Sequence, residues 1–227
     1  HGIWYTPVTG IWQTVWIEPV PAANHIAGIT TRSDIRAGVL SVDVKTARTG
    51  SDRVCVTLSA DGKTLAERSS MAGQPVHLAV EHPRLWSPDD PYLYDLTVTL
   101  VRDGRVIDRA ESYAALREIA TGRDANGIER MTLNGRPLFH FGPLDQGWWP
   151  DGLYTAPTDE ALLYDIRFTK QLGFNMIRKH IKVEPERWYW HCDREGILVW
   201  QDMPSGDMST GKWEPHRYGA GTDAARS

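Results

Sequence analysis

Residues 158–200 read TDEALLYDIRFTKQLGFNMIRKHIKVEPERWYWHCDREGILVW, and this stretch decides the fold class because helix and strand patterns alternate along it. Thr158 can cap a helix with an acidic first turn, and Gly173 can end that helix. Pro185 suits the first turn of a second helix. Strands are predicted over residues 174–178 and 197–200, each directly after a helix, and a short apolar run predicts another strand upstream over residues 138–141. Strands that alternate with helices in this way form a parallel sheet with right-handed crossovers.

A different pattern fills residues 22–120, where short segments alternate apolar and polar residues. Turn pairs occur at Asp61-Gly62 and Asp103-Gly104. The alternating segments are residues 39–44, 53–59, 76–80, 94–101 and 106–113. Period-two alternation interrupted by Asp-Gly pairs is typical of an antiparallel sandwich. We therefore expect an immunoglobulin-like β-sandwich of about seven strands.

The first residues indicate a strand that belongs to another domain. Residues 11–18 place aromatic side chains on one face and apolar ones on the other, which predicts a partly buried strand. Pro19 and Pro21 end it, because proline cannot donate to a ladder. The chain opens at His1 with neither an initiator methionine nor a signal peptide. We therefore expect an internal fragment whose residues 1–21 are the last strand of a preceding domain.

The composition argues against several function classes. Lys and Arg number 25 against 29 Asp and Glu, so the basic footprint of a nucleic-acid binder is missing. The longest apolar run is about four residues, far short of the roughly 18 that a membrane span needs. Cys55 and Cys192 lie far apart, so they indicate neither a disulfide framework nor a cysteine zinc site. We expect no nucleic-acid partner, no membrane span, no cofactor and no metal.

Functional groups follow the ends of the predicted parallel strands. In α/β sheets, the groups that act on ligands lie just after the carboxyl ends of the strands. The candidate substrate-binding residues selected by this rule are Asp145, Trp148, Trp149, Arg178, His180 and Asp202. Charged, amide and aromatic groups on one rim suit a sugar, whose hydroxyls bind polar groups while its C–H face packs on indole.

Each candidate also has a structural alternative. Trp148-Trp149 could pack a long loop, and Arg178 could be a structural ion-pair partner. Asp145 and Asp202 could cap loops. His180 has no neighbours at metal-ligand spacing, which favours a hydrogen-bonding role over a metal site.

Other polar and aromatic groups near the second predicted helix are expected to be structural. Trp188 and Trp190 lie on that helix, where core or interface packing explains them. Glu184 and Glu186 flank Pro185 at its start, where the helix dipole favours acidic residues. We expect no catalytic carboxylate there.

Four motifs in order resemble family 2 glycoside hydrolases. Residues 83–94, PRLWSPDDPYLY, resemble a segment of the family's immunoglobulin-like domain. Residues 133–138, LNGRPL, resemble the hairpin before the first barrel strand, and residues 173–178, GFNMIR, resemble the second strand. Residues 193–199, DREGILV, resemble the segment that leads into the third. Each motif alone is a weak signal, but the set spans nearly the whole chain.

The resemblance implies an architecture and a chemistry. It implies a sugar-binding jelly roll ending with residues 1–21, an immunoglobulin-like sandwich over 22–120, and the first three βα units of a TIM (β/α)₈ barrel over 121–227. It also implies retaining hydrolysis of β-glycosides, in which an acid protonates the leaving oxygen and a carboxylate about 5–5.5 Å away attacks the sugar. In the family these groups follow the fourth and seventh strands. We therefore expect no catalytic residue in this chain, which would be inactive alone.

Departures from the family's pattern limit what can be carried over. Ile181 occupies the usual position of a histidine, and His180 is offset by one residue, which would reverse its facing on a strand. Residues 115–117, ALR, replace the more usual Gly-Phe-Arg. We therefore expect an oligosaccharide or β-glycoside substrate of unspecified sugar. Relatives are commonly exported, which suggests a periplasmic or secreted protein. The alternative is a non-catalytic carbohydrate-binding or scaffolding protein with a degenerate half-barrel.

Overall fold

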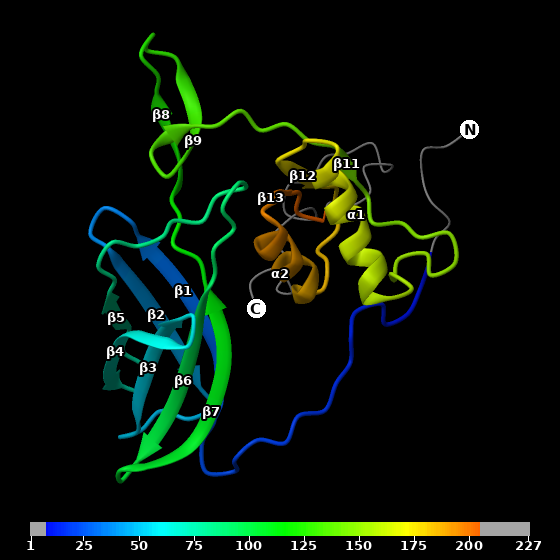
Figure 1. Cartoon of the computed structure of the whole chain (residues 1–227). Helices are drawn as coiled ribbons and strands as arrows, with labels where there is room; N and C mark the ends of the chain where they lie inside the picture. Colours follow the sequence, from blue (N-terminus) through cyan, green and yellow to red (C-terminus); the bar gives the residue numbers. More distant parts are fainter. Residues whose placement is uncertain (1–7, 205–227) are drawn as a thin grey trace, which may run out of the picture. The chain divides into compact units, whose positions relative to one another are not determined.

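The computed structural model describes residues 8–204, which divide into two compact units (Figure 1). One unit comprises residues 17–139, and the other joins residues 8–16 to residues 140–204. Each unit has its own apolar core. Within the described residues, no helix is long and apolar enough to cross a membrane.

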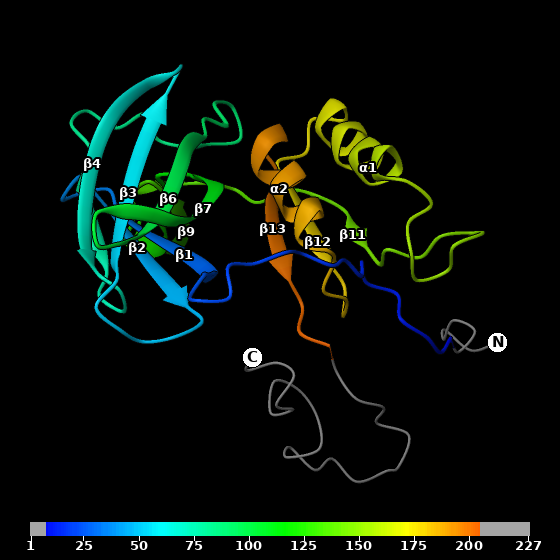
Figure 2. The same ribbon diagram turned by 90° about the horizontal axis from the view of Figure 1, so that it is seen from below.

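Two antiparallel sheets make up most of the first unit (Figure 2). Their strands are β1 (Ile26–Asp34), β2 (Val39–Thr46), β3 (Arg53–Ala60), β4 (Lys63–Met71), β5 (Val76–Ala79), β6 (Tyr94–Arg102) and β7 (Arg105–Ala114). The strand orders are β1-β2-β5 and β4-β3-β6-β7. Apolar side chains from both sheets form one core cluster, so the sheets pack face to face. Seven strands in this arrangement confirm the predicted antiparallel sandwich.

The sequence pattern explains these strands. Leu40 and Val42 of β2 are fully buried, whereas the residues between and beside them are only partly buried. Asp61 and Asp103 have positive φ angles of 50° and 48°, and the glycine that follows each has φ near 75°. Two successive residues with positive φ form the tight turn that matches strand twist. Both predicted hairpin turns are therefore confirmed.

A small antiparallel sheet follows the sandwich in the same unit. It has the order β10-β9-β8 and comprises β8 (Ile119–Arg123), β9 (Glu129–Leu133) and β10 (Arg136–Pro137). Asn134 and Gly135 form the turn between β9 and β10, both with positive φ. The unit that holds the sandwich thus extends to residue 139, beyond the predicted domain boundary near residue 120.

The second unit contains a parallel sheet and two helices. In chain order its elements are β11 (Leu144–Asp145), α1 (Asp159–Gln171), β12 (Met176–Lys179), α2 (Glu186–Glu195) and β13 (Leu198–Gln201). The strands lie in the order β11-β12-β13, and both pairs are parallel. Thr158 caps α1 by accepting a hydrogen bond from the Ala161 N–H at 3.1 Å, and Pro185 precedes α2. The predicted β-α-β-α-β order is confirmed.

The first parallel strand is not where the sequence placed it. Residues 138–141 form no strand, and β11 begins at Leu144. The apolar run is not buried, because Phe139 is 81% exposed and Phe141 is 54% exposed. Pro143 has no N–H to donate, but its carbonyl accepts from the Arg178 N–H at 3.0 Å. Regular pairing therefore starts only after the proline.

The prediction of a strand over residues 11–18 is also wrong, since residues 8–25 contain no strand. Instead, residues 8–16 belong to the second unit, where hydrogen bonds to side chains and loops hold them. Gln13 Nε2 donates to the Val183 carbonyl at 3.1 Å, and Arg187 donates to Thr14 Oγ1 at 2.9 Å. Trp16 is 71% exposed. Alternating hydrophobicity alone therefore does not produce a strand here, because the segment contacts side chains and loops and has no neighbouring strand among the described residues to pair with.

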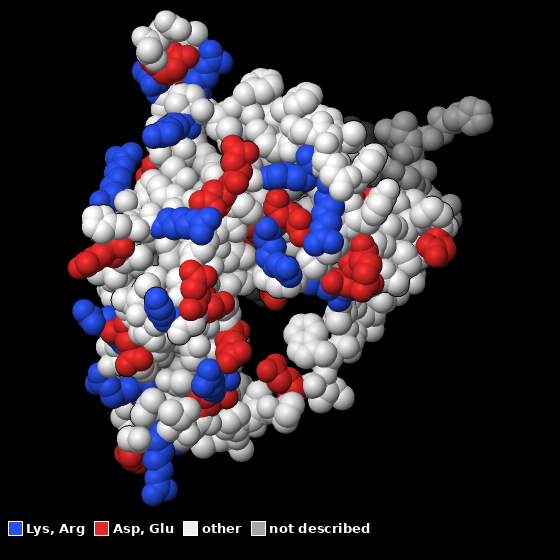
Figure 3. Space-filling view, in the orientation of Figure 1, with Lys and Arg blue, Asp and Glu red and all other residues white. Residues whose placement is uncertain are grey.

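Charged side chains of both signs are interspersed on the surface drawn in Figure 3. Several form exposed ion pairs, such as Arg84 with Asp90 at 2.6 Å and Arg130 with Asp124 at 3.0 Å. Exposed pairs of this kind add little stability, typically below about 1 kcal/mol.

Candidate functional site

The three parallel strands place the predicted site residues on two faces of their sheet. Ile177 and Val199 pack into a core with residues of both helices, so their face is helix-covered. Because side chains alternate along a strand, Arg178 points to the opposite face, which no helix of residues 8–204 covers and which is called the helix-free face below. Parallel register places Asp145 beside Lys179, the residue after Arg178. Asp145 therefore lies on the helix-covered face, away from Arg178.

Arg178 and Asp202 form a bidentate ion pair at the carboxyl ends of β12 and β13. Arg178 Nε lies 3.1 Å from Asp202 Oδ1, and Nη2 lies 2.9 Å from Oδ2. These hydrogen bonds lower the pKa of Asp202 and raise the pKa of Arg178, so both groups are charged at neutral pH. The Arg178 side chain is 46% exposed. The pair thus presents a fixed, accessible cation that can bind a carboxylate or a sugar hydroxyl.

His180 lies at the same strand ends. Its backbone N–H donates to the Asp145 carbonyl at 2.8 Å, and its Nδ1 is 3.3 Å from Gln146 Nε2. With the Gln146 amide nitrogen as donor, Nδ1 accepts and the neutral ring carries its proton on Nε2. The His180 ring lies close enough to the Asp202 carboxylate to interact with it electrostatically. The structure therefore brings Arg178, His180 and Asp202 together.

A ring pair that is not among the predicted site residues lies beside this cluster. Trp200 is in register with Arg178 and shares its face. The Trp200 indole N–H donates to His140 Nδ1 at 2.8 Å, and the ring centroids lie 5.8 Å apart. Burial lowers the pKa of His140, which favours the neutral ring that accepts this bond. The facing rule for strands would have identified Trp200, but His140 lies outside any strand.

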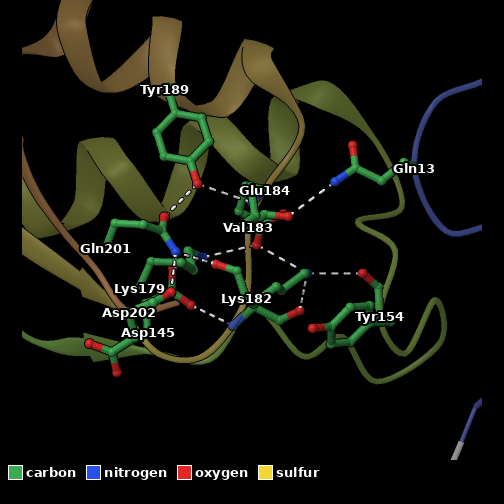
Figure 4. Close-up of polar contacts among 11 residues, drawn as sticks. Gln13, Asp145, Tyr154, Lys179, Lys182, Val183, Glu184, Tyr189, Gln201 and Asp202 are labelled. Carbon is green, nitrogen blue, oxygen red and sulfur yellow. Dashed lines mark hydrogen bonds and ion pairs between the residues drawn. The ribbon is translucent and has the colours of Figure 1, made fainter. Parts of the chain in front are cut away.

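A buried charge cluster lies on the helix-covered side of the same rim (Figure 4). Lys179 Nζ is 2.6 Å from Asp145 Oδ2 and 3.0 Å from Glu184 Oε1. Lys182 Nζ is 3.0 Å from the same Glu184 oxygen. The side chains of Lys179, Lys182 and Glu184 are at most 2% exposed. Two lysines and two carboxylates thus offset one another's desolvation cost.

Lys182 fixes the loop that follows β11. Its Nζ donates to the carbonyls of Gly147 at 2.7 Å and Tyr154 at 2.9 Å. Burial lowers the pKa of Lys182, and the carboxylate of Glu184 opposes that shift. Gly147 is required in this packing, because a Cβ there would collide with the Glu184 and Lys182 side chains. Lysines are rarely buried, so this cluster could not be expected from residue types alone.

The two adjacent tryptophans have different environments. Trp149 packs against the core of the second unit, and its indole N–H is buried with no hydrogen-bond partner among residues 8–204. Trp148 is half-buried, and its ring lies 6.3 Å from that of Tyr154. Trp188 is buried in the core, which confirms its predicted structural role. Trp148 is therefore the tryptophan of the 148–149 pair that is better placed to contact a ligand.

A hollow of about 430 Å³ opens beside this loop. Asp145, Gln146 and both tryptophans line it, together with Asp165 from α1. Burial, followed by the negative charge of Asp145, raises the pKa of Asp165. Within the described residues, no three His, Cys, Asp or Glu side chains are grouped so that they could hold a metal ion. The hollow therefore offers hydrogen-bonding and aromatic groups to a ligand.

Known proteins resemble the chain in sequence. Residues 24–117 match the family described as Glycosyl hydrolases family 2. The chain is 26% identical over 197 residues to a beta-galactosidase of Lactococcus lactis, covering 85% of this chain and 19% of that protein. It is 31% identical over 213 residues to a Formosa agariphila protein provisionally named a beta-glucuronidase, covering 89% of this chain and 19% of that protein. The chain thus spans about a fifth of the length of these curated relatives.

Solved structures resemble the chain in fold. A beta-glucuronidase from Ruminococcus gnavus has a TM-score of 0.69 at 22% identity, covering 80% of this chain and 30% of that chain. A beta-glycosidase from Bacteroides vulgatus has a TM-score of 0.65 at 25% identity, covering 78% of this chain and 23% of that chain.

Proposed function

This chain belongs to the family 2 glycoside hydrolases, and on that premise we propose that it forms part of a retaining β-glycosidase that hydrolyses β-linked sugars. We place the described parallel sheet in the wall of a (β/α)₈ barrel, preceded by an immunoglobulin-like sandwich. The two catalytic carboxylates of such an enzyme would come from outside these 227 residues. This chain alone is then expected to bind, but not hydrolyse, a glycoside.

The strand order supports the barrel. β11, β12 and β13 are neighbours in chain order, and residues of α1 and α2 join one core on one face of the sheet. In a closed barrel, consecutive strands are adjacent and all helices lie outside. An open doubly wound sheet instead carries helices on both faces. The helix-free face, which bears Arg178, would then point toward the barrel axis.

The accessible Arg178–Asp202 pair is the observation that carries the proposed function. Retaining hydrolysis needs one carboxylic acid to protonate the leaving oxygen and one carboxylate to attack the anomeric carbon. A guanidinium at the strand ends would keep a nearby nucleophilic carboxylate ionised by lowering its pKa. Asp202 holds that guanidinium in place, and His180 beside it can bind a sugar hydroxyl.

The other predicted site residues receive different roles in this proposal. Trp148 offers an aromatic wall to the sugar. Asp145 and Trp149 support the rim, since Asp145 holds Lys179 and the Gly147 N–H, while Trp149 packs on the core.

The test uses the full-length protein and a panel of aryl β-glycosides that includes the galactoside, glucuronide and mannoside. On the best substrate, Arg178→Ala is expected to lower kcat/KM by about 100-fold or more, as for loss of a group that stabilises transition-state charge. Arg167→Ala is the matched control, because Arg167 forms an ion pair with Glu195 at 3.0 Å on the two helices. It should change kcat/KM by less than about twofold.

Three other results would count against the proposal. Equal kcat/KM for Arg178→Ala and the wild type would remove Arg178 from the site. Early release of the α-anomer, followed by NMR, would exclude a retaining mechanism. Binding of glycosides without turnover of any would favour the non-catalytic carbohydrate-binding alternative.

A further inference from the structure

A second hollow, of about 610 Å³, lies between two segments that are far apart in the sequence. Residues 8–12 form one wall, and residues 152–155 with Trp148 form the other. Trp148 also lines the hollow that contains Asp145 and Gln146, so the two hollows share this side chain. The volume of the second hollow falls within the range of about 300–1,000 Å³ typical of ligand pockets.

Contacts between the two walls hold the second hollow open. The Trp12 and Tyr154 rings meet edge to face with their centroids 4.5 Å apart. Thr155 Oγ1 donates to the Trp12 carbonyl at 3.3 Å. The buried Lys182 ammonium lies 4.5 Å from the Tyr154 centroid and 5.2 Å from that of Trp12. The charge cluster of the rim thus supports both walls, and the hollow exists before any ligand arrives.

The described lining combines three aromatic rings with aliphatic and hydroxyl side chains. It comprises Val8, Thr9, Gly10, Ile11, Trp12, Trp148, Gly152, Leu153, Tyr154 and Thr155. None of these side chains is an acid or a base at neutral pH, so the part of the lining that belongs to residues 8–204 offers an anionic sugar no ion-pair partner. Indole and phenol rings can pack against the C–H face of a pyranose, and the hydroxyls of Thr9 and Thr155 can bind its hydroxyls.

We propose that this hollow is a subsite for a neutral sugar unit on the leaving-group side of the hydrolysed bond, and that Trp12 contacts that sugar. The proposal rests on the proposed glycosidase function. It gives residues 8–12 a part in substrate choice, although they lie more than a hundred residues before the strand-end site in the sequence. The preferred substrate is then an oligosaccharide with an uncharged sugar next to the scissile bond.

The experiment compares two substrates of the full-length protein that share the best glycone from the aryl glycoside panel. One is a β-linked disaccharide with a neutral second sugar, and the other is the β-glycosyl fluoride, whose leaving group is too small to reach the hollow. Trp12→Ala is expected to lower kcat/KM for the disaccharide about tenfold. The same variant should change kcat/KM for the fluoride less than about twofold.

Two further variants keep the test sharp. Thr9→Trp fills the hollow without removing a wall contact, and it should reproduce the selective loss on the disaccharide. Trp16→Ala is the control, because Trp16 lies on the same segment, does not line the hollow and is 71% exposed. It should leave both substrates unaffected.

The outcomes separate this inference from the proposed function. If neither substrate is hydrolysed by the wild type, the glycosidase function fails. If the wild type is active but Trp12→Ala and Thr9→Trp slow both substrates equally or neither, the subsite is wrong while the enzyme assignment stands.

Discussion

At the scale of single residues, Asp52 shows how a buried carboxylate can be kept ionised. Its Oδ2 accepts from Asn24 Nδ2 at 2.7 Å and from Arg102 Nη2 at 2.8 Å, and its Oδ1 accepts from Arg102 Nε at 2.7 Å. The hydrogen bonds from Arg102, followed by the one from Asn24, lower the pKa of Asp52 from 3.8 to about 2. This carboxylate joins β6 to the segments before β1 and β3 in the sandwich unit.

The lowered pKa makes sandwich stability sensitive to acid. Between the folded pKa near 2 and the unfolded value near 3.8, the unfolded state binds more protons, so this contribution is present above pH 4 and is lost as pH falls toward 2. The Asp52→Asn variant should therefore be less stable than the wild type at pH 7. Its free energy of unfolding should also change less between pH 4 and pH 2 than that of the wild type. Urea unfolding followed by far-ultraviolet circular dichroism across this range measures both effects. Asp43→Asn is the control, because Asp43 forms an exposed ion pair, and its free energy of unfolding should depend on pH as that of the wild type does. If the free energies of unfolding of Asp52→Asn and the wild type change in parallel with pH, Asp52 is not the source of the acid sensitivity.

The same scale shows how much of the site the sequence could predict. Arg178 and Asp202 were expected at strand ends, and they do meet there. The opposite facing of Asp145 could not be predicted, because it depends on the register of β11, a strand of two residues. Lys179 and Lys182 were missed since only the folded loops supply the carboxylates and carbonyls that make a buried ammonium tolerable.

At the scale of elements, Gly142 decides how closely the segment before β11 approaches β12. A Cβ at this position would overlap the backbone carbonyl of Met176. Backbone atoms of a paired strand cannot move aside as a flexible side chain can. Gly142 therefore sets the approach that allows Pro143 to accept a hydrogen bond from Arg178.

Gly142→Ala should destabilise the second unit by about 3 kcal/mol, because the added methyl overpacks a strand contact. Tryptophan fluorescence during urea unfolding reports mainly this unit, since Trp86 is the one tryptophan within residues 17–139. Gly50→Ala in the sandwich unit is the control for an added methyl that meets nothing within 4 Å: its free energy of unfolding, followed by far-ultraviolet circular dichroism, should stay within about 1 kcal/mol of the wild type. Similar unfolding curves for Gly142→Ala and the wild type would show that the segment can shift freely.

Local chemistry explains which elements were predictable. Buried residues alternate with more exposed ones along β2, β3, β5 and β6, and residues with positive φ form the turns at Asp61 and Asp103. Thr158 and Gly173 mark the two ends of α1. These signals are complete within short stretches of sequence. The segment over 11–18 alternates equally well, but a strand also needs a neighbour to accept its hydrogen bonds, and its described contacts are with side chains and loops.

At the scale of the whole molecule, the second unit leaves apolar surface without cover from the described residues. Tyr164 and Phe168 of α1 are 65% and 47% exposed, and Leu172, which caps the helix, is 57% exposed; the three lie on successive turns of one side. Leu144 of β11 is 49% exposed, and β11 pairs with β12 alone among the described strands. An open strand edge beside exposed aromatic residues is a template for association with another chain.

The 227-residue chain in isolation is therefore expected to self-associate, with a mass by light scattering above 25.6 kDa that rises with concentration. Phe168→Glu should shift the population toward monomer, because it places a charge in the centre of the uncovered α1 surface. Leu65→Glu is the matched control, since Leu65 on β4 is 48% exposed but belongs to the sandwich unit. A concentration-independent monomer for the wild type would show that the uncovered surface does not drive association. If both substitutions reduce self-association equally, net charge rather than the uncovered α1 surface controls the association.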